Sequence, residues 1–251
     1  PSMDKITLNA IRALRRKPER TEQGRFVVEG DKGVAELVES SIAVERMYYV
    51  STMEHAVPVS HRHVAEQISV KDMGRISQMN TAPGLLAVAS IPKRAPEEVV
   101  RAVEGSPMAH GLIACRLQDP GNLGTLIRTA DWFGFGGVFI TEDTVDPWNA
   151  KTVQASMGSI FRIPVVEAPM DFLHQLSGHF HLEMQGTPHS TIPWTSGWIW
   201  VGSESHGFAG VDLPSSSVPV HIPRVGSAES LNAGVASSIV CAEVARVKTG
   251  A

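Results

Sequence analysis

Three short stretches in the second half of the chain combine polar side chains with glycine and other small residues. They read DPGNLGTLIRTA at 119–130, VGSESHG at 201–207 and IPRVGSAESLNAG at 222–234. Each comes directly after, or at the end of, an apolar run that predicts a buried strand. Polar groups gathered where parallel strands end are typical of a binding or catalytic site. The candidate residues supply two amides, a guanidinium, a carboxylate and a hydroxyl: Asn122, Arg128, Glu204, Ser230 and Asn232.

Other chemistries lack their defining residues. The chain has neither G-x-G-x-x-G after the strand GLIACRL nor G-x-x-x-x-G-K-[ST], which argues against dinucleotide and P-loop sites. A serine hydrolase built on Ser205 stays open as an alternative, although Ser203 stands where the nucleophile elbow needs glycine. Four histidines fall within residues 174–189 without H-E-x-x-H spacing or a nearby cysteine, so no metal site is expected.

The elements that would position these residues alternate between strand and helix, which predicts an α/β fold with a mostly parallel sheet. The expected strands are GLIACRL, GVFIT, RIPVV, HLEMQG, WIWVG and VHIP, and the expected helices lie near 122–133, 149–158, 171–177 and 231–247. The first half predicts a smaller α/β unit from a basic helix near 6–17, a helix in DKGVAELVES, and the segments RFVVEG, ERMYYV and GLLAVAS.

Prolines and charges in IPKRAPEE at 91–98 interrupt the apolar pattern and separate the two halves. This break predicts a first domain over residues 1–95, a linker and domain start over 96–108, and a second domain over 109–251. The cysteines Cys115 and Cys241 both lie in apolar sequence, which predicts buried thiols in a reducing compartment, by default the cytoplasm. No apolar run is long enough to predict a membrane span.

The net charge of −4 argues against a uniformly basic nucleic-acid binder. The charge is uneven, however, because residues 1–25 hold seven basic and three acidic side chains and carry +4. The basic residues Arg12, Arg15, Arg16 and Lys17 indicate either contact with a polyanion or a solvated helix face, and charge alone does not separate the two.

Taken in order, DPGNLGTLIRTADWFG, VGSESHGF and IPRVGSAESLNAGVA resemble the SpoU (TrmH-like) family of RNA 2'-O-ribose methyltransferases in the SPOUT superfamily. The resemblance covers nearly all of residues 110–251. RFVVEGDKGVAELV and TAPGLLAVA are similar to the family's N-terminal substrate-binding domain, which has a fold like that of a ribosomal protein. The motifs depart from the family at Arg224, where methionine is common, and in AGVASS after the SLN triplet.

The resemblance implies S-adenosylmethionine as cofactor, held near Gly202, Ile222 and Leu231. It gives the five polar residues above catalytic or substrate-binding roles and implies a homodimer formed through the catalytic domain. It also implies a deep trefoil knot, which the small residues after Asn232 would permit because backbone passes close to backbone. Large-subunit rRNA is the expected substrate. A tRNA methyltransferase and a non-catalytic RNA-binding or ribosome-assembly protein of the same fold are the alternatives.

If the basic residues contact phosphates, replacing Arg12, Arg15 and Arg16 by glutamine is expected to weaken RNA binding. The slope of log K against log salt should shrink by roughly 0.7 for each phosphate of single-stranded RNA that the protein no longer neutralises. The modified nucleotide should stay the same, because phosphate contacts carry no sequence information. Binding measured over a salt series checks this, and an unchanged slope would assign these residues to a solvated helix face.

Overall fold

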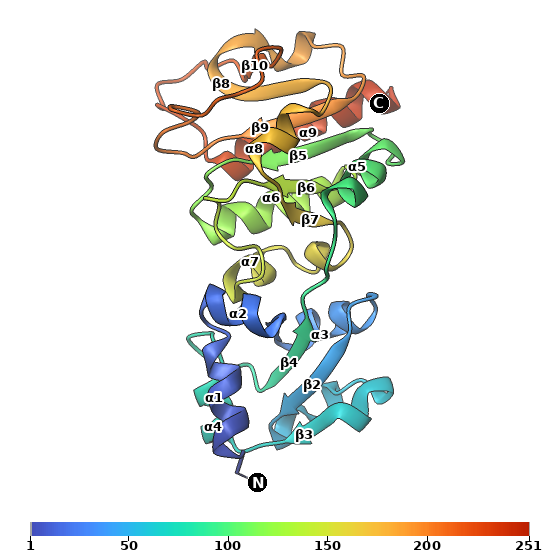
Figure 1. Ribbon diagram of the computed structural model, residues 1–251, viewed down its shortest axis with the longest axis vertical. Helices are drawn as coiled ribbons and strands as arrows, with labels where there is room; N and C mark the ends of the chain where they lie inside the picture. The colour runs from blue at the N-terminus through green and yellow to red at the C-terminus, as the bar shows by residue number, and fades with distance from the viewer. Residues whose placement is uncertain (1, 251) are drawn as a thin grey trace. The chain divides into compact units, whose positions relative to one another are not determined.

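A computed structural model describes residues 2–250 and divides the chain into two compact units. One unit holds the chain up to Lys93 together with Asp146–Phe161, and the other holds Arg94–Val145 together with the chain from Arg162 onward. Each unit has its own sheet (Figure 1). None of the described helices is both long enough and apolar enough to cross a membrane.

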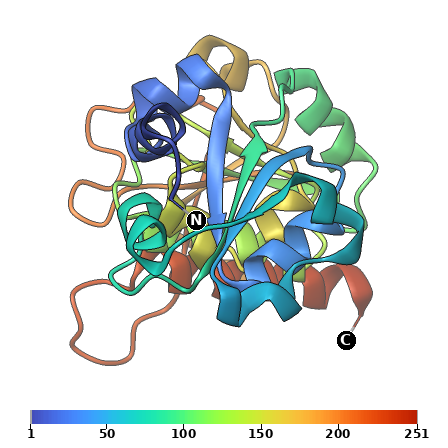
Figure 2. The same cartoon turned by 90° about the horizontal axis from the view of Figure 1, so that it is seen from below.

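The first unit is built on a four-stranded sheet in the order β1-β4-β2-β3. β1 and β2 are antiparallel to β4, whereas β3 is parallel to β2. Helices α1 and α4 pack against each other in this unit (Figures 1 and 2). The strands are β1 (Arg25–Glu29), β2 (Val44–Tyr49), β3 (Ala65–Gln67) and β4 (Leu85–Ser90). The helices are α1 (Lys5–Ala13), α2 (Lys17–Gln23), α3 (Asp31–Val38) and α4 (Val70–Ile76), with 3-10 turns at Ser51–Ala56 and Val59–Val64.

The single basic helix expected near 6–17 is wrong, because the chain forms two helices there. α1 ends at Ala13, and α2 begins at Lys17 with proline in its first turn. Pro18 lacks the N–H that a continuing helix needs and its ring would clash with the carbonyl four residues earlier, but it is tolerated in a first turn, so the chain starts a new helix here. Arg12 therefore does not share one helix face with Arg15 and Arg16.

The segment Asp146–Phe161, far along the chain, also belongs to the first unit. It contains α7 (Ala150–Ala155), shorter than the helix expected over 149–158, and a 3-10 turn at Ser159–Phe161. Arg20 is 4% exposed and its Nη2 lies 2.6 Å from Asp146 Oδ2. The rings of Phe26 and Trp148 lie 4.7 Å apart. The first unit is therefore discontinuous in sequence, and the assignment of residues 109–251 to one functional domain stays a prediction.

The second unit is an α/β fold on a six-stranded sheet, as the alternating pattern predicted. Every pairing in it is parallel, in the order β10-β8-β9-β5-β6-β7. The strands are β5 (His110–Ala114), β6 (Val138–Ile140), β7 (Val165–Glu167), β8 (His179–Pro188), β9 (Gly197–Val201) and β10 (Val218–His221). The helices are α5 (Pro96–Glu104), α6 (Pro120–Trp132), α8 (Met170–His174) and α9 (Ala233–Thr249), with a 3-10 turn at His189–Thr191.

Helix α5 was not expected, because its residues fall within the segment assigned to the linker and domain start. Pro96 stands in its first turn, where the missing N–H costs nothing. Val99 and Val103 lie on its buried face and join a core cluster with Phe139, Leu173 and Trp198. Glu97 and Glu98 of IPKRAPEE therefore belong to the first turn of a helix, whereas Lys93 and Arg94 precede it.

Both cysteines are free and buried, as their apolar surroundings predicted. Burial raises the pKa of the Cys115 thiol to about 11, with the nearby Asp143 carboxylate adding to the shift. Burial also raises the pKa of Cys241. Both thiols are therefore protonated at neutral pH and are poor nucleophiles.

His110 on β5 is a buried titratable group among aromatic rings. Its ring lies 5.8 Å from Phe135 and 6.0 Å from Trp194. Nδ1 lies 2.7 Å from the carbonyl oxygen of Met108, whereas Nε2 has no hydrogen-bond partner in the described structure. Burial is the main cause that lowers the pKa of His110. The neutral imidazole is therefore the form that the folded protein favours.

Folding stability is expected to fall as the pH drops below about 6.5, where an unfolded histidine takes up a proton that folded His110 resists. The contribution of His110 is fully present above that pH and is lost below it. His110→Asn keeps an amide donor for the Met108 carbonyl but cannot titrate, so its free energy of unfolding should depend less on pH. Urea unfolding between pH 5 and 7.5 measures the difference, and equal slopes in both proteins would contradict the assignment.

Candidate functional site

The first polar stretch forms the start of α6. Asp119 is the N-cap, and its Oδ1 accepts a hydrogen bond from the backbone N of Asn122 at 2.8 Å. Asn122 therefore does not cap this helix with its own side chain. Its amide is left to donate to the Glu204 carboxylate, with 2.5 Å between Nδ2 and Oε1.

Glu204 joins all three stretches. Besides Asn122, its Oε1 accepts from Asn232 Nδ2 at 2.9 Å and from the backbone N of Ala233 at 3.3 Å. Asn232 Nδ2 also lies 2.8 Å from Asn122 Oδ1. At the same time Asn232 caps α9, because its Oδ1 accepts from the backbone N of Val235 at 3.2 Å. Three segments that are distant in the sequence thus share one carboxylate.

A cavity of about 450 Å³ lies beside this carboxylate. Its walls include the 202–210 loop, which follows β9, and the chain between β10 and α9. The three residues expected to hold a cofactor, Gly202, Ile222 and Leu231, all line it, as do Glu204 and Ser230. The structure therefore brings the predicted cofactor residues together at one hollow, although a cofactor role for them stays a prediction.

Small residues are required where these segments meet. A Cβ on Gly202 would lie 2.9 Å from the carbonyl oxygen of Gly207, inside the 202–210 loop. A Cβ on Gly234 would lie 3.0 Å from Thr125 Cγ2, where α9 approaches α6. Thr129 Oγ1 and Ser238 Oγ, 2.9 Å apart, join the same two helices. The run of small residues at the start of α9 therefore serves close approach of the helices.

Arg128 stands apart from the cavity. It is exposed on α6, does not line the cavity, and makes no hydrogen bond or ion pair with any described residue. Asn122 and Glu204 bond to each other, and neither contacts Arg128. Arg224 does line the cavity, and its Nη1 donates to the carbonyl of Ala228 at 3.2 Å.

The basic residues of the first unit differ in their contacts. Arg15 donates to the carbonyl oxygens of Ser77 and Arg75, at 2.5 and 3.3 Å. Arg16 pairs with Glu19 at 2.7 Å, and Arg12 is exposed without a partner among the described residues. RNA contact by these residues and by Lys17 stays a prediction. Arg12→Gln alone is its cleanest test, because replacing Arg15 also removes hydrogen bonds that hold the unit together.

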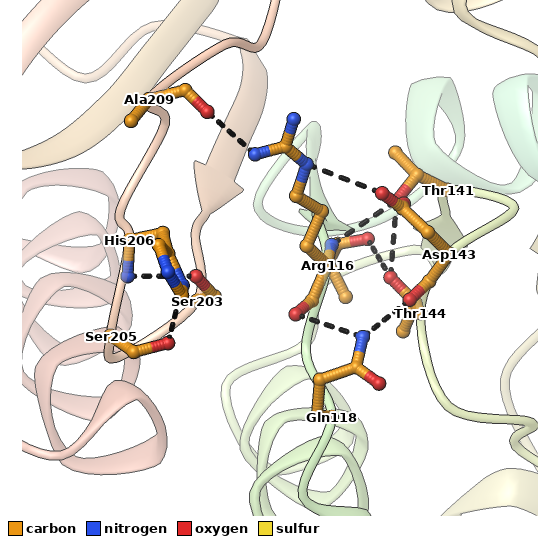
Figure 3. A network of polar contacts seen from close by, with 10 residues as sticks. Arg116, Gln118, Thr141, Asp143, Thr144, Ser203, Ser205, His206 and Ala209 are labelled. Carbon is orange, nitrogen blue, oxygen red and sulfur yellow. Dashed lines mark hydrogen bonds and ion pairs between the residues drawn. The ribbon is translucent and has the colours of Figure 1, made fainter.

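The structure gives little support to a serine hydrolase site at Ser205 or to a metal site. Ser205 Oγ lies 2.7 Å from His206 Nδ1, but no carboxylate of the described chain bonds to His206 (Figure 3). A nucleophilic serine would need such a group to orient its base. Across residues 2–250, no three His, Cys, Asp or Glu side chains come close enough to hold a metal ion.

The sequence did not predict that β8 contributes to the cavity wall. Leu182, Glu183 and Met184 of β8 also line it. The segment HLEMQG was expected as a strand but received no site role, because its residues lack any motif. Their position in a strand next to β9 and β10 is the signal that would have found them.

Comparison with known proteins places this geometry in context. Residues 110–242 match the model of the SpoU rRNA Methylase family, and residues 6–87 match the MRM3-like substrate binding domain. The chain is 29% identical to the 23S rRNA (guanosine(2553)-2'-O)-methyltransferase RlmP of Bacillus subtilis over 234 residues, covering 90% of this chain and 91% of that protein.

Two solved structures share the fold. The SpoU methyltransferase AviRb from Streptomyces viridochromogenes, in complex with the cofactor AdoMet, has a TM-score of 0.81 at 26% identity and covers 97% of this chain and 98% of its own. The AdoMet-bound rRNA methyltransferase from Sinorhizobium meliloti has a TM-score of 0.82 at 27% identity and covers 98% of this chain and 96% of its own.

Proposed function

Because the chain belongs to the SpoU rRNA methylase family, we propose that it transfers a methyl group from S-adenosylmethionine to a ribose 2'-hydroxyl of RNA. The observation that carries this proposal is the cavity beside Glu204, lined by the residues that the family pattern assigns to the cofactor. We favour large-subunit rRNA as the substrate, because relatives over most of the chain's length are named for 23S rRNA. This substrate and the two buried thiols favour a cytoplasmic location.

The cavity fits such a cofactor. Its volume of about 450 Å³ is in the range of ligand sites. Gly202 brings bare backbone to the wall, and a side chain there would collide with Gly207. Gly202, Ile222 and Leu231 would hold the cofactor, and its sulfonium supplies an electrophilic methyl group to the reaction.

The protein's own contribution to the reaction is orientation and charge. Glu204 Oε1 accepts hydrogen bonds from three donors, so we assign Glu204 to holding the segments of the site together. Arg128 is poorly suited to act as a base, since a guanidinium is essentially never neutral at pH 7. We assign Arg128 to stabilising negative charge that develops on the ribose oxygen and to holding a neighbouring phosphate, which takes the proton. Ser230 and Asn232 would bind substrate.

Two features of the family's architecture enter as proposals. The first is the trefoil knot, which is supported by the contact of Asn232 and Ala233 with Glu204 in the loop after β9. The second is an RNA-binding role for the first unit, supported by the match of residues 6–87 to a substrate binding domain. Residues 94–145 and 162–251 would then carry the methyl transfer.

The decisive experiment maps ribose methylation in ribosomal RNA from cells with and without the gene. One 2'-O-methyl group in large-subunit rRNA should disappear on deletion and return when the purified protein and S-adenosylmethionine are added to the unmethylated RNA. A missing methyl group in tRNA instead would assign the substrate to tRNA. An unchanged methylation map with intact RNA binding would favour the non-catalytic protein of the same fold.

We also propose a homodimer formed through the catalytic domain. Trp132 at the end of α6 is 82% exposed, and Val235 on the neighbouring α9 is 48% exposed. Apolar side chains on adjoining helices are suited to cover each other in a second copy. Light scattering at micromolar concentration should give about twice the chain mass of 27.0 kDa. A stable monomer would contradict the proposal, and Trp132→Ser should shift the equilibrium toward monomer.

Arg128→Ala is expected to lower turnover by about 10²- to 10³-fold, the order expected for removing one donor that stabilises charge in the transition state. The affinity for S-adenosylmethionine should hardly change, because Arg128 does not line the cavity. Single-turnover methylation and calorimetric cofactor binding separate the two effects. Arg128→Lys keeps the charge without the planar fork, so full activity in that variant would rule out a guanidinium-specific role. A parallel loss of cofactor affinity in Arg128→Ala would mean that its position has been misassigned.

A further inference from the structure

Arg116, directly after β5, holds an unusual backbone conformation. Its φ is 57°, in the left-handed region that residues with a side chain rarely adopt. The conformation is fixed from both sides: its backbone N donates to Thr141 Oγ1 at 3.2 Å, and its carbonyl accepts from Gln118 Nε2 at 3.4 Å. A residue held in a sparsely populated backbone conformation often has a functional reason. The direction of its side chain supplies one here.

The guanidinium of Arg116 links two separate segments. Nη1 donates to the carbonyl oxygen of Ala209 at 2.6 Å, and Nε lies 3.2 Å from Asp143 Oδ2 (Figure 3). Asp143 is itself fixed, because its Oδ1 accepts from Thr141 Oγ1 at 2.7 Å. Two planar donors aimed in different directions are a property of arginine that lysine lacks. The cation therefore ties the end of the 202–210 loop to the chain that follows β6.

The tied loop is a wall of the cavity. Gly202, Ser203, Glu204 and Gly207 all line it. The loop has two polar anchors on other segments: Glu204, bonded to the starts of α6 and α9, and Ala209, bonded to Arg116. Between them the loop bonds to itself: Gly207 N donates to Ser203 O and Ala209 N donates to His206 O, both at 2.9 Å, and His206 N donates to Ser203 Oγ at 3.2 Å.

We propose that Arg116 is a positioning residue that holds the 202–210 loop in the conformation competent to bind S-adenosylmethionine. The inference rests on the proposed function, since it takes the cavity to be the cofactor site. Where only a fraction of the molecules holds the competent conformation, the apparent affinity falls by that fraction. Once the cofactor is bound, its contacts with the loop hold the wall closed, so turnover at saturating cofactor is largely preserved.

Three substitutions separate the guanidinium from the strained backbone. Arg116→Ala removes the side chain and keeps the unfavourable φ, whereas Arg116→Gly removes both. Arg116→Lys keeps the charge but not two divergent donors. The control is Arg101→Ala, which removes an exposed arginine on α5, away from the cavity. Calorimetry with S-adenosylmethionine, steady-state methylation and hydrogen exchange of the 202–210 loop are measured on each full-length protein.

Both Arg116→Ala and Arg116→Gly should raise the Kd for S-adenosylmethionine roughly tenfold, the order expected for removing a charge-assisted hydrogen bond. They should also speed exchange in the 202–210 loop and leave kcat at saturating cofactor within about threefold. Arg116→Lys should recover part of the affinity, and Arg101→Ala should match the wild type. Arg116→Gly keeps the experiment decisive if the strained alanine variant does not fold.

An unchanged cofactor Kd in Arg116→Gly would overturn the proposal. Weaker RNA binding with unchanged cofactor affinity would do so as well and would assign the guanidinium, which is 30% exposed, to a phosphate contact. A large fall in kcat with unchanged Kd would also count against a positioning role. Failure of the wild type itself to bind S-adenosylmethionine would instead contradict the proposed function.

Discussion

The carboxylate of Glu204 is the interaction on which the rest of the site depends. It accepts hydrogen bonds from two side-chain amides and one backbone N–H, each from a segment far away in the sequence. Charge-assisted hydrogen bonds of this kind are stronger than neutral ones. Removing the shared acceptor would leave Asn122 Nδ2 and the backbone N of Ala233 without a partner, whereas Asn232 Nδ2 would keep Asn122 Oδ1. The positions of the start of α6, the cap of α9 and the cavity wall therefore all depend on this one carboxylate.

Much of this arrangement was predictable from the sequence, because the polar residues sit where apolar strands end. The strands of the parallel sheet and the gathering of Asn122, Glu204 and Asn232 follow from local patterns. The hydrogen-bond partners of these polar side chains could not be predicted from the same patterns. The structure shows that Asp119 caps α6, which leaves the Asn122 amide to Glu204. Spacing alone does not say which of two neighbouring polar side chains faces the helix.

Helix boundaries and the membership of segments in each unit were also harder to predict, because they depend on contacts between residues that are distant in the sequence. The sequence predicted one basic helix near 6–17, whereas the backbone ends α1 at Ala13 and begins α2 at Lys17. The segment after β6 lies amid the second unit's sequence, and its membership in the first depends on contacts of Asp146 and Trp148 with residues more than a hundred positions away. Long-range pairings of this kind leave no periodic trace in the chain.

The arginines show why counting charges overstates what a surface offers to a polyanion. Arg20 is buried against a carboxylate, and Arg15 and Arg116 are spent on backbone carbonyls of other segments. Five donors in one planar group make arginine well suited to joining chain segments. Arg12 and Arg128, by contrast, are exposed and have no side-chain partner among the described residues.

The discontinuity of the first unit has a consequence for synthesis on the ribosome. Its sheet is complete in sequence by Ser90, but the partners of Arg20 and Phe26 emerge only with Asp146 and Trp148. By then the nascent chain already carries β5, α6 and β6, but β9, which pairs with β5, has not been made. Domains usually fold as units in the order of translation. The first unit lacks Asp146–Phe161 until β5 and β6 have been made, and the second unit lacks β9 for longer still. We therefore expect both units to keep part of their core exposed until late in translation.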